Sequence, residues 1–86
     1  MTTQGTLSIR LQNKGSKSEG LYAILTDAEE KKWTLYRPEY YPANDEFFTP
    51  FDGHQVSVEG EPELDNYICV NNITIIEETK EEPENE

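Results

Sequence analysis

The stretch that decides the fold is GHQVSVEG, at residues 53–60. Between its two glycines, the valines at positions 56 and 58 alternate with polar and charged residues. A period of two is typical of a β-strand that has one face in a core and the other in water. This stretch therefore predicts a half-buried strand over residues 55–60.

A further strand is predicted on the C-terminal side, over residues 67–76, after an acidic turn at residues 61–66. Its alternation slips once, because the first apolar pair has even residue numbers and the next pair has odd ones. The four residues are Ile68, Val70, Ile73 and Ile75. One extra residue at Asn71-Asn72 would bring all four onto one face, which is what a β-bulge does. We therefore predict a bulge at this pair.

Three strands are predicted on the N-terminal side of the deciding stretch. They cover residues 5–12, 20–26 and 32–37. The second of them is apolar at both parities from residue 21 to residue 25, which indicates a central strand. A loop of small residues and lysines over 13–18 separates the first two strands, and a polar reversal at 27–31 makes the second and third a hairpin.

Residues 38–52, which we call the aromatic connection, join the third and fourth predicted strands. Pro38 ends the third strand because it lacks the N–H group that strand pairing needs. Asn44 can cap a short helical turn, and Asp45 and Glu46 are favourably placed at the positive end of that turn. Three phenylalanines are predicted to share one face of it: Phe47, Phe48 and Phe51. A following proline and glycine keep the turn short, so it is expected to act as a plug.

The order of three strands, a short aromatic helical connection and two strands resembles the oligonucleotide/oligosaccharide-binding (OB) type of barrel. The deciding stretch, together with ICVNNI at residues 68–73, resembles the glycine-flanked fourth strand and bulged fifth strand of small bacterial stand-alone OB-fold-like domains. The resemblance covers residues 5–76. It implies an all-β, five-stranded barrel whose open bottom is closed by the helical turn. An SH3-like barrel is the alternative fold.

Both ends of the chain lie outside this predicted domain. Residues 1–4 are expected to be a flexible N-terminus. Residues 77–86 hold six acids and one lysine, and no apolar residue follows Ile76. Such a segment cannot bury enough apolar surface to offset the entropy lost on ordering. A disordered acidic C-terminal tail is therefore expected.

The whole chain is short and acidic, with 86 residues and a formal net charge of −11. Its single cysteine, Cys69, excludes an internal disulfide and fits a reducing compartment. The N-terminus lacks the features of a signal peptide, and no apolar run approaches the roughly 20 residues that span a bilayer. We expect a cytoplasmic monomer with no contact with membranes.

The sequence carries no motif for catalysis or for metal binding. His54 is the only histidine and the single cysteine lies within a predicted strand, so a zinc site built from soft ligands is not expected. Neither a nucleophile elbow nor a phosphate-binding glycine loop is present. We therefore expect a protein that is not an enzyme and that needs no cofactor.

The OB resemblance implies that ligands lie across the second and third strands and the loops that flank them. The candidate binding surface consists of Tyr22, Trp33, Tyr36, Arg37, Tyr40 and Tyr41. Arg37 is expected to lie over an aromatic ring or to pair with an acid of the connection. Rings beside basic residues suit single-stranded nucleic acid, but four acids between Glu59 and Asp65 are expected on the opposite wall, where they would repel phosphates.

Three functions remain open at this point. The main hypothesis is a non-catalytic binding module that recognises a protein or peptide through the barrel face or an exposed strand edge, with Tyr40, Tyr41 and Pro42 as the contact patch. The first alternative is a single-stranded nucleic-acid-binding domain. The second is a binder of a small ligand or saccharide that uses Trp33 as its platform.

Overall fold

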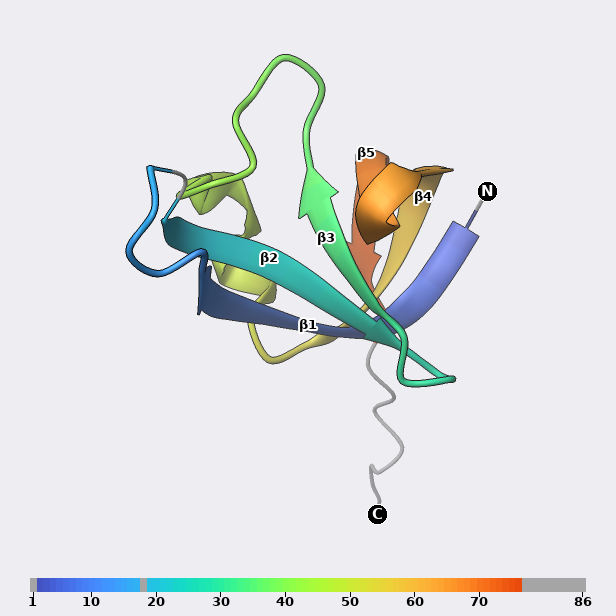
Figure 1. The fold of residues 1–86 in the computed structure, drawn as a ribbon. Helices are drawn as coiled ribbons and strands as arrows, with labels where there is room; N and C mark the ends of the chain where they lie inside the picture. Colours follow the sequence, from blue (N-terminus) through green and yellow to red (C-terminus); the bar gives the residue numbers. More distant parts are fainter. Residues whose placement is uncertain (1, 18, 77–86) are drawn as a thin grey trace.

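The alternating segments of the sequence form one five-stranded sheet that closes in a ring, as the computed structural model of residues 2–17 and 19–76 shows (Figure 1). The strands are β1 (Thr2–Gln12), β2 (Gly20–Asp27), β3 (Lys32–Tyr36), β4 (Gln55–Glu63) and β5 (Tyr67–Ile75). Two short 3₁₀ helices accompany them, η1 (Glu46–Phe51) and η2 (Leu64–Asn66). The predicted all-β class is confirmed. The predicted acidic tail, residues 77–86, lies outside the described residues.

Neighbouring strands follow the order β1-β2-β3-β5-β4, and β4 returns to β1 to close the ring. All pairs are antiparallel except β3 and β5, which are parallel. β1 can close the ring because it is long. Its residues 5–12 pair with β2, and its residues 2–6 pair with β4.

The structure corrects the prediction of a flexible N-terminus for residues 2–4. Residues 2–4 form the start of β1 and pair with residues 57–59 of β4. The segment contains no apolar alternation, so periodicity gave no sign of a strand. Its two threonines nevertheless have high β-propensity, and pairing satisfies the backbone N–H and C=O groups along that side of β4.

β4 extends to Glu63, whereas the sequence predicted a turn from residue 61. The extension pairs with the start of β5, and Pro62 lies opposite Ile68. Proline is tolerated there because the pairing of β4 with β1 ends at Glu59. The missing N–H group can then face the unpaired side of β4 without breaking a ladder.

The predicted bulge in β5 is confirmed. Glu59 of β4 pairs with Asn72 and Gly60 pairs with Val70, so Asn71 is the extra residue. Because of this insertion, Val70 on one side of the bulge is buried and Ile73 on the other side packs against the core. The bulge thus restores the inward face that the alternation had lost.

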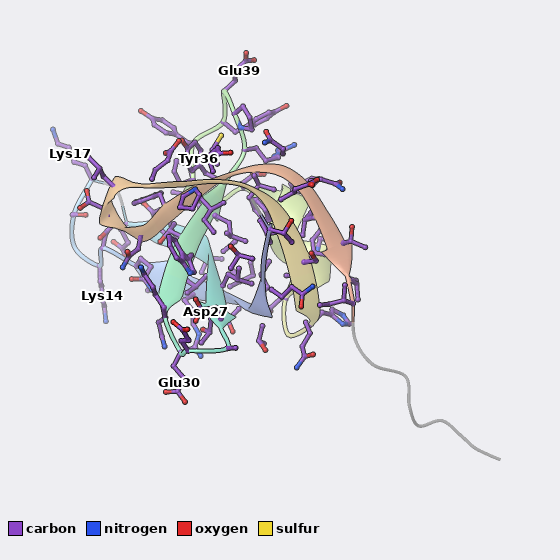
Figure 2. All side chains as sticks on the ribbon, turned by 90° about the vertical axis from the view of Figure 1, so that its right-hand side faces the viewer. Lys14, Lys17, Asp27, Glu30, Tyr36 and Glu39 are labelled. Atoms are coloured by element: carbon purple, nitrogen blue, oxygen red, sulfur yellow. The ribbon has the colours of Figure 1, made fainter. Side chains whose placement is uncertain are left out.

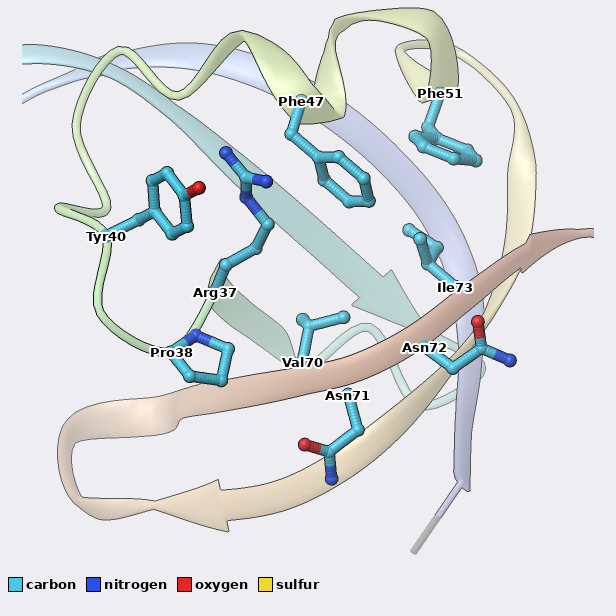
Figure 3. A pocket seen from close by; sticks show the side chains of 9 residues that line it. All are labelled: Arg37, Pro38, Tyr40, Phe47, Phe51, Val70, Asn71, Asn72 and Ile73. Atoms are coloured by element: carbon cyan, nitrogen blue, oxygen red, sulfur yellow. The ribbon is translucent and has the colours of Figure 1, made fainter.

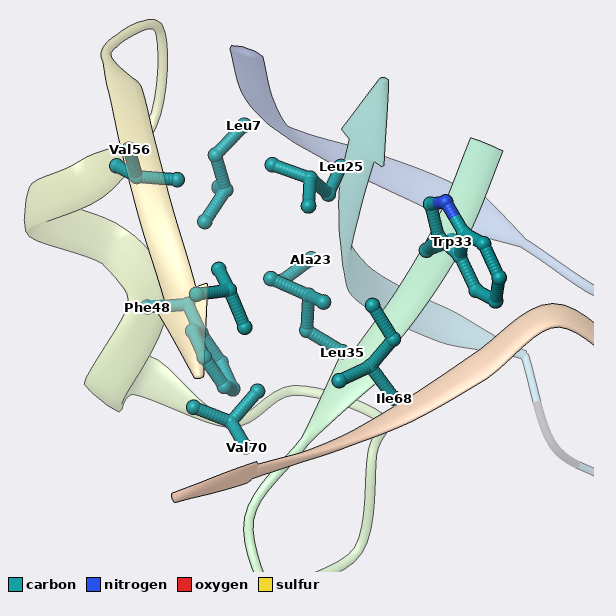
Figure 4. Packing of buried hydrophobic residues seen from close by; sticks show 10 residues of the cluster. Leu7, Ala23, Leu25, Trp33, Leu35, Phe48, Val56, Ile68 and Val70 are labelled. Carbon is teal, nitrogen blue, oxygen red and sulfur yellow. The ribbon is translucent and has the colours of Figure 1, made fainter. Parts of the chain in front are cut away.

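The core fills the interior of the ring and draws on every strand and on η1 (Figure 4). Its buried members are Leu7, Ala23, Leu25, Trp33, Leu35, Phe48, Val56, Val58, Ile68 and Val70. Phe48 lies at the η1 end of this cluster and Trp33 lies at the opposite end (Figure 4). η1 therefore closes one end of the ring, as the sequence predicted for the helical turn.

The helical turn differs from its prediction in its cap and in its apolar face. Asp45 caps η1, because its side chain accepts a hydrogen bond from the N–H group of Phe47. Asn44, the predicted cap, has a left-handed backbone with φ of 60°. Only Phe48 is buried, whereas Phe47 is exposed. A 3₁₀ helix has three residues per turn, so the side-chain positions deduced from α-helical spacing do not hold.

Candidate functional site

An ion pair fixes the start of the aromatic connection to its helix. Arg37 follows β3 directly and donates two hydrogen bonds to Asp45, from Nε to Oδ2 at 2.9 Å and from Nη2 to Oδ1 at 2.8 Å. The side chains are 27% and 5% exposed, respectively. Although burial alone would raise the pKa of Asp45, the hydrogen bonds from Arg37 and from the N–H of Phe47 hold this pKa below its ordinary value.

Arg37 also lies between two aromatic rings. Its guanidinium carbon is 3.7 Å from the ring centre of Tyr40 and 4.5 Å from that of Phe47. A guanidinium within about 6 Å of a ring centre is attracted by the ring's quadrupole. The prediction that Arg37 contacts either a ring or an acid of the connection is therefore confirmed for both kinds of partner.

A second anchor ties the connection to β2. The side-chain Oδ1 of Asn44 accepts a hydrogen bond from the N–H of Leu21 at 2.9 Å, and the N–H of Asn44 donates to the carbonyl of Leu21 at 2.6 Å. Asn44 thus extends the pairing of β2 where β3 no longer reaches. The connection is thus held to η1 through Arg37 and to β2 through Asn44, and residues 38–43 lie between these two anchors.

Two tyrosine rings project from the chain between these anchors. Tyr40 is 56% exposed and Tyr41 is 88% exposed. Glu39, which precedes them in the chain, lies at the outer end of the connection (Figure 2). Exposed aromatic rings on an anchored segment can bind a partner without the entropy cost of ordering a loop.

On one side of the connection lies a groove of about 820 Å³, which we call the tyrosine groove. The rings that line it are Tyr22, Tyr41 and Tyr67, from β2, the connection and β5. Lys17 and Glu19 of the loop between β1 and β2 line the same groove. Tyr22 is buried and Tyr67 is half-buried, so Tyr41 is the most accessible of the three rings.

On the other side lies a groove of about 490 Å³, which we call the bulge groove (Figure 3). Its walls are Arg37, Pro38, Tyr40, Phe47 and Phe51 on one side and residues 70–73 of β5 on the other. Figure 3 shows Phe47 and Phe51 of η1 facing β5 across this groove. The groove has an apolar interior with the side-chain amides of Asn71 and Asn72 along β5.

Tyr36 links the outer face of β3 to β5 and to β4. Its hydroxyl donates a hydrogen bond to Oε1 of Glu63 at 2.6 Å, and its ring meets that of Tyr67 edge to face at 6.0 Å. The hydrogen bond to Glu63, followed by burial, raises the pKa of the Tyr36 hydroxyl above its ordinary value. One of the four acids expected along the opposite wall therefore lies against a tyrosine of the candidate surface.

Trp33 does not belong to an exposed surface, which corrects its inclusion among the candidate binding residues. It is 8% exposed and packs in the core. Its Nε1 donates a hydrogen bond to Oδ2 of Asp27 at 3.1 Å, and Nζ of Lys31 lies 4.3 Å from its ring centre. The sequence already indicated this placement, because Trp33 and Leu35 are two residues apart on a strand and therefore point to the same face, and Leu35 is also buried.

The structure therefore divides the predicted surface. It brings Arg37 and Tyr40 together, places Tyr41 beside them on the connection, and puts Tyr36 on the outer face of β3. Tyr22 is 5% exposed, so its inclusion in an exposed surface is corrected as well. Sequence reasoning missed Tyr67, and it gave Asn44 the role of helix cap in place of its observed role as the anchor to β2. The sequence placed Tyr67 at the start of a predicted strand. It did not show that this strand pairs in parallel with β3, because the alternation of apolar residues does not reveal which strands are neighbours.

The described residues hold no group of three or more histidine, cysteine, aspartate or glutamate side chains placed to bind a metal ion. None of the helices in the described part of the chain is long and apolar enough to cross a membrane. Comparison with known proteins gave no match to any protein-family model, curated protein or solved structure.

Proposed function

We propose that this chain is a non-catalytic binding module that recognises a segment of a protein partner through the aromatic connection. We also assign the fold to the OB type of barrel. Three strands, a helical turn at one end of the ring and two further strands support that assignment, as does β1 pairing with both β2 and β4.

The observation that carries the proposal is the exposure of Tyr40 and Tyr41 on a segment held by two anchors. Interfaces are enriched in tyrosine, tryptophan and arginine, and their strongest contacts come from rings that are already ordered. The pair of Arg37 with Asp45 supplies that order at one end and Asn44 supplies it at the other. A contact patch at Tyr40 and Tyr41 needs both rings to face solvent, and both are exposed.

The charge of the chain favours a basic partner. Its net charge is −11, and Glu39 and Glu46 are exposed beside the tyrosines. Complementary charge speeds encounter and discriminates against wrong partners more than it strengthens the final complex. Lysine or arginine near the apolar contact residues is therefore the expected feature of the ligand.

A pull-down tests this function. The tagged protein is compared with a Tyr40→Ala/Tyr41→Ala double variant in a lysate, with quantitative mass spectrometry of the captured proteins. Leu64→Ala is the matched control, because Leu64 is 88% exposed, as is Tyr41, but lies in η2. We expect specific partners to be lost with the double variant and kept with the control. Identical partners for all three proteins would exclude the proposed function.

Single-stranded nucleic acid is the second candidate ligand, and one observation favours it. The tyrosine groove combines three rings with Lys17, and stacking rings beside cations suit such a ligand. Against this, Glu19 lines the same groove and Glu63 bonds Tyr36 on the same outer face. Binding of short oligonucleotides at low salt that weakens as salt rises, and that Tyr41→Ala abolishes, would support this candidate.

A further inference from the structure

The parallel pairing of β3 with β5 ends early. It covers three positions, from Thr34 opposite Tyr67 to Tyr36 opposite Cys69. Pro38 follows in the connection, where the chain leaves β5. On its other side, β5 stays paired with β4 as far as Ile75. Among the described residues, no strand pairs with Val70–Ile73 on the side where β3 would continue. We call this segment the open edge of β5.

The bulge groove lies along this open edge. Figure 3 shows β4 on one side of β5 and the groove on the other, with Val70, Asn71, Asn72 and Ile73 along the strand. The opposite wall is the η1 pair Phe47 and Phe51. The groove therefore combines an unpaired strand edge with an apolar wall, in a volume of about 490 Å³.

An open strand edge carries unused backbone donors and acceptors. Successive residues of a regular strand direct their N–H and C=O groups to opposite sides, so part of the groups of residues 70–73 point away from β4, although the bulge at Asn71 interrupts the alternation. The backbone hydrogen bonds of loops and turns in the described part of the chain do not involve these four residues. An extended chain in the groove could pair with the groups that face it.

We propose that the open edge of β5 accepts an extended segment of a partner protein as an added β-strand. The segment alternates apolar and basic residues. This inference rests on the proposed function and specifies how the partner would bind. At a rise of about 3.3 Å per residue, the edge would hold about three to four residues of the ligand.

The alternation follows from the two faces of the added strand. Side chains on its inner face would meet Phe47, Phe51 and Ile73, which favours aliphatic residues there. Side chains on its outer face would point away from the phenylalanines, toward solvent, next to the amides of Asn71 and Asn72. Glu59 lies opposite Asn72 on β4, two strand spacings of about 4.8 Å each from the added strand, a gap that the long side chain of a lysine or arginine can span.

The charges of the site argue against a second copy of this chain as the occupant. Each copy has a net charge of −11, so pairing two open edges would bring two strongly acidic molecules together. The cation that lines the groove, Arg37, is already paired with Asp45. A basic segment is therefore the occupant that the charges favour.

The test uses three acetylated and amidated hexapeptides of the sequence Lys-Val-Lys-Val-Lys-Val. One is unmodified, one is N-methylated at all three valines, and one is N-methylated at all three lysines. The two methylated peptides have the same composition but block opposite sides of an extended strand. A fourth peptide, Glu-Val-Glu-Val-Glu-Val, tests the charge requirement. Affinity is measured by calorimetry, and hydrogen exchange of the amides at residues 70–73 is followed by NMR.

We expect the unmodified basic peptide to bind and to slow exchange at residues 70–73. One methylated peptide should bind as well as the unmodified one, and the other should bind at least about tenfold more weakly, because it loses two or more hydrogen bonds to the edge. The acidic peptide should bind more weakly than its basic counterpart. This one-sided loss is specific to strand addition.

Equal affinity of the two methylated peptides, whether strong or weak, would overturn strand addition, and so would the absence of binding by the unmodified peptide. Neither result bears on the proposed function, which the tyrosine double variant tests separately. If the double variant loses its partners while methylation has no one-sided effect, the module binds protein through its rings alone.

Discussion

Asp45 accepts two hydrogen bonds from the guanidinium of Arg37 and a third from the N–H of Phe47. One carboxylate therefore binds the residue that follows β3, caps η1 and holds the cation that lies over the ring of Tyr40. The geometry makes Asp45 the residue on which the arrangement of the connection depends.

Replacing this carboxylate should weaken both the fold and the connection. Asp45→Ala removes the cap and leaves Arg37 half-buried without its acid, which should lower the free energy of unfolding by about 1–3 kcal/mol. Urea unfolding measures the change. Glu46→Ala, at an exposed neighbouring acid, is the control and should change the midpoint little. Equal midpoints for the two variants would show that the ion pair contributes nothing to stability.

A second carboxylate, that of Asp27, should contribute to the dependence of stability on pH. Its hydrogen bonds from Trp33 and from the N–H groups of Lys31 and Glu29 lower its pKa below the ordinary 3.8. A lowered folded-state pKa means that the stabilisation is present above pH 3.8 and is lost as pH falls through the folded-state pKa. Asp27→Asn should therefore be less stable than the wild type at pH 7, and the gap should shrink below pH 3.8.

Denaturant midpoints at pH 7 and at about pH 3, followed by Trp33 fluorescence, measure this gap. The comparison between variants matters because protonating many of the 18 acids also relieves repulsion across the whole chain. A gap that stays constant over this range would show that the carboxylate of Asp27 gains nothing from its three donors.

The plug formed by η1 should depend on one phenylalanine. Phe48 is buried and Phe47 is exposed, although they are adjacent and their rings are 5.1 Å apart. Phe48→Ala should cost about 3–5 kcal/mol, because it removes a core side chain and leaves a cavity. Phe47→Ala should cost clearly less, and thermal unfolding of both variants measures the difference. If Phe48→Ala does not fold, Phe48→Leu supplies a smaller change, and it should still exceed that of Phe47→Leu.

Much of the fold could be predicted from the sequence because it follows from alternation. The strand at residues 55–60 showed its inward valines directly, and the slip at Asn71-Asn72 was detectable because apolar residues flank it on both sides. The start of β1 was not detectable, because residues 2–4 are polar and their strand conformation depends on pairing with β4. A polar strand carries no periodic signal.

The candidate site could be predicted only in part, for a physical reason. The sequence placed rings on strands and on the connection, but exposure depends on what covers each ring. Trp33 packs in the core, whereas Tyr41 is exposed on the connection that Asn44 holds to β2. That anchor joins residues 23 positions apart in the sequence, and no local pattern predicts such a contact.

The bulge should require a glycine opposite it. A Cβ added at Gly60 would clash with the carbonyl oxygen of Cys69, which is backbone and cannot move aside without shifting β5. Gly60→Ala should therefore destabilise the protein by about 1–3 kcal/mol, as overpacking does. Urea unfolding compares it with Glu59→Ala, the exposed neighbour on the same strand. A cost no larger than that of the control would mean that β5 shifts freely at the bulge.

The burial of Trp33 determines what its fluorescence can report. Its ring is 8% exposed and its Nε1 is bonded to Asp27, so acrylamide should quench the folded protein much less than the protein in denaturant. Ligands that occupy either groove should leave this emission nearly unchanged, because Trp33 lines neither of them.

A tryptophan at position 41 should behave in the opposite way. Tyr41 is 88% exposed and lines the tyrosine groove, so Tyr41→Trp in a Trp33→Phe background places the reporter in the proposed contact surface. Any partner that binds through the connection should shift or quench its emission, whereas the wild-type emission should stay constant in the same titration. If binding instead changes Trp33 and not the new ring, the partner acts near the β2–β3 turn, and the surface proposed around the connection is the wrong one.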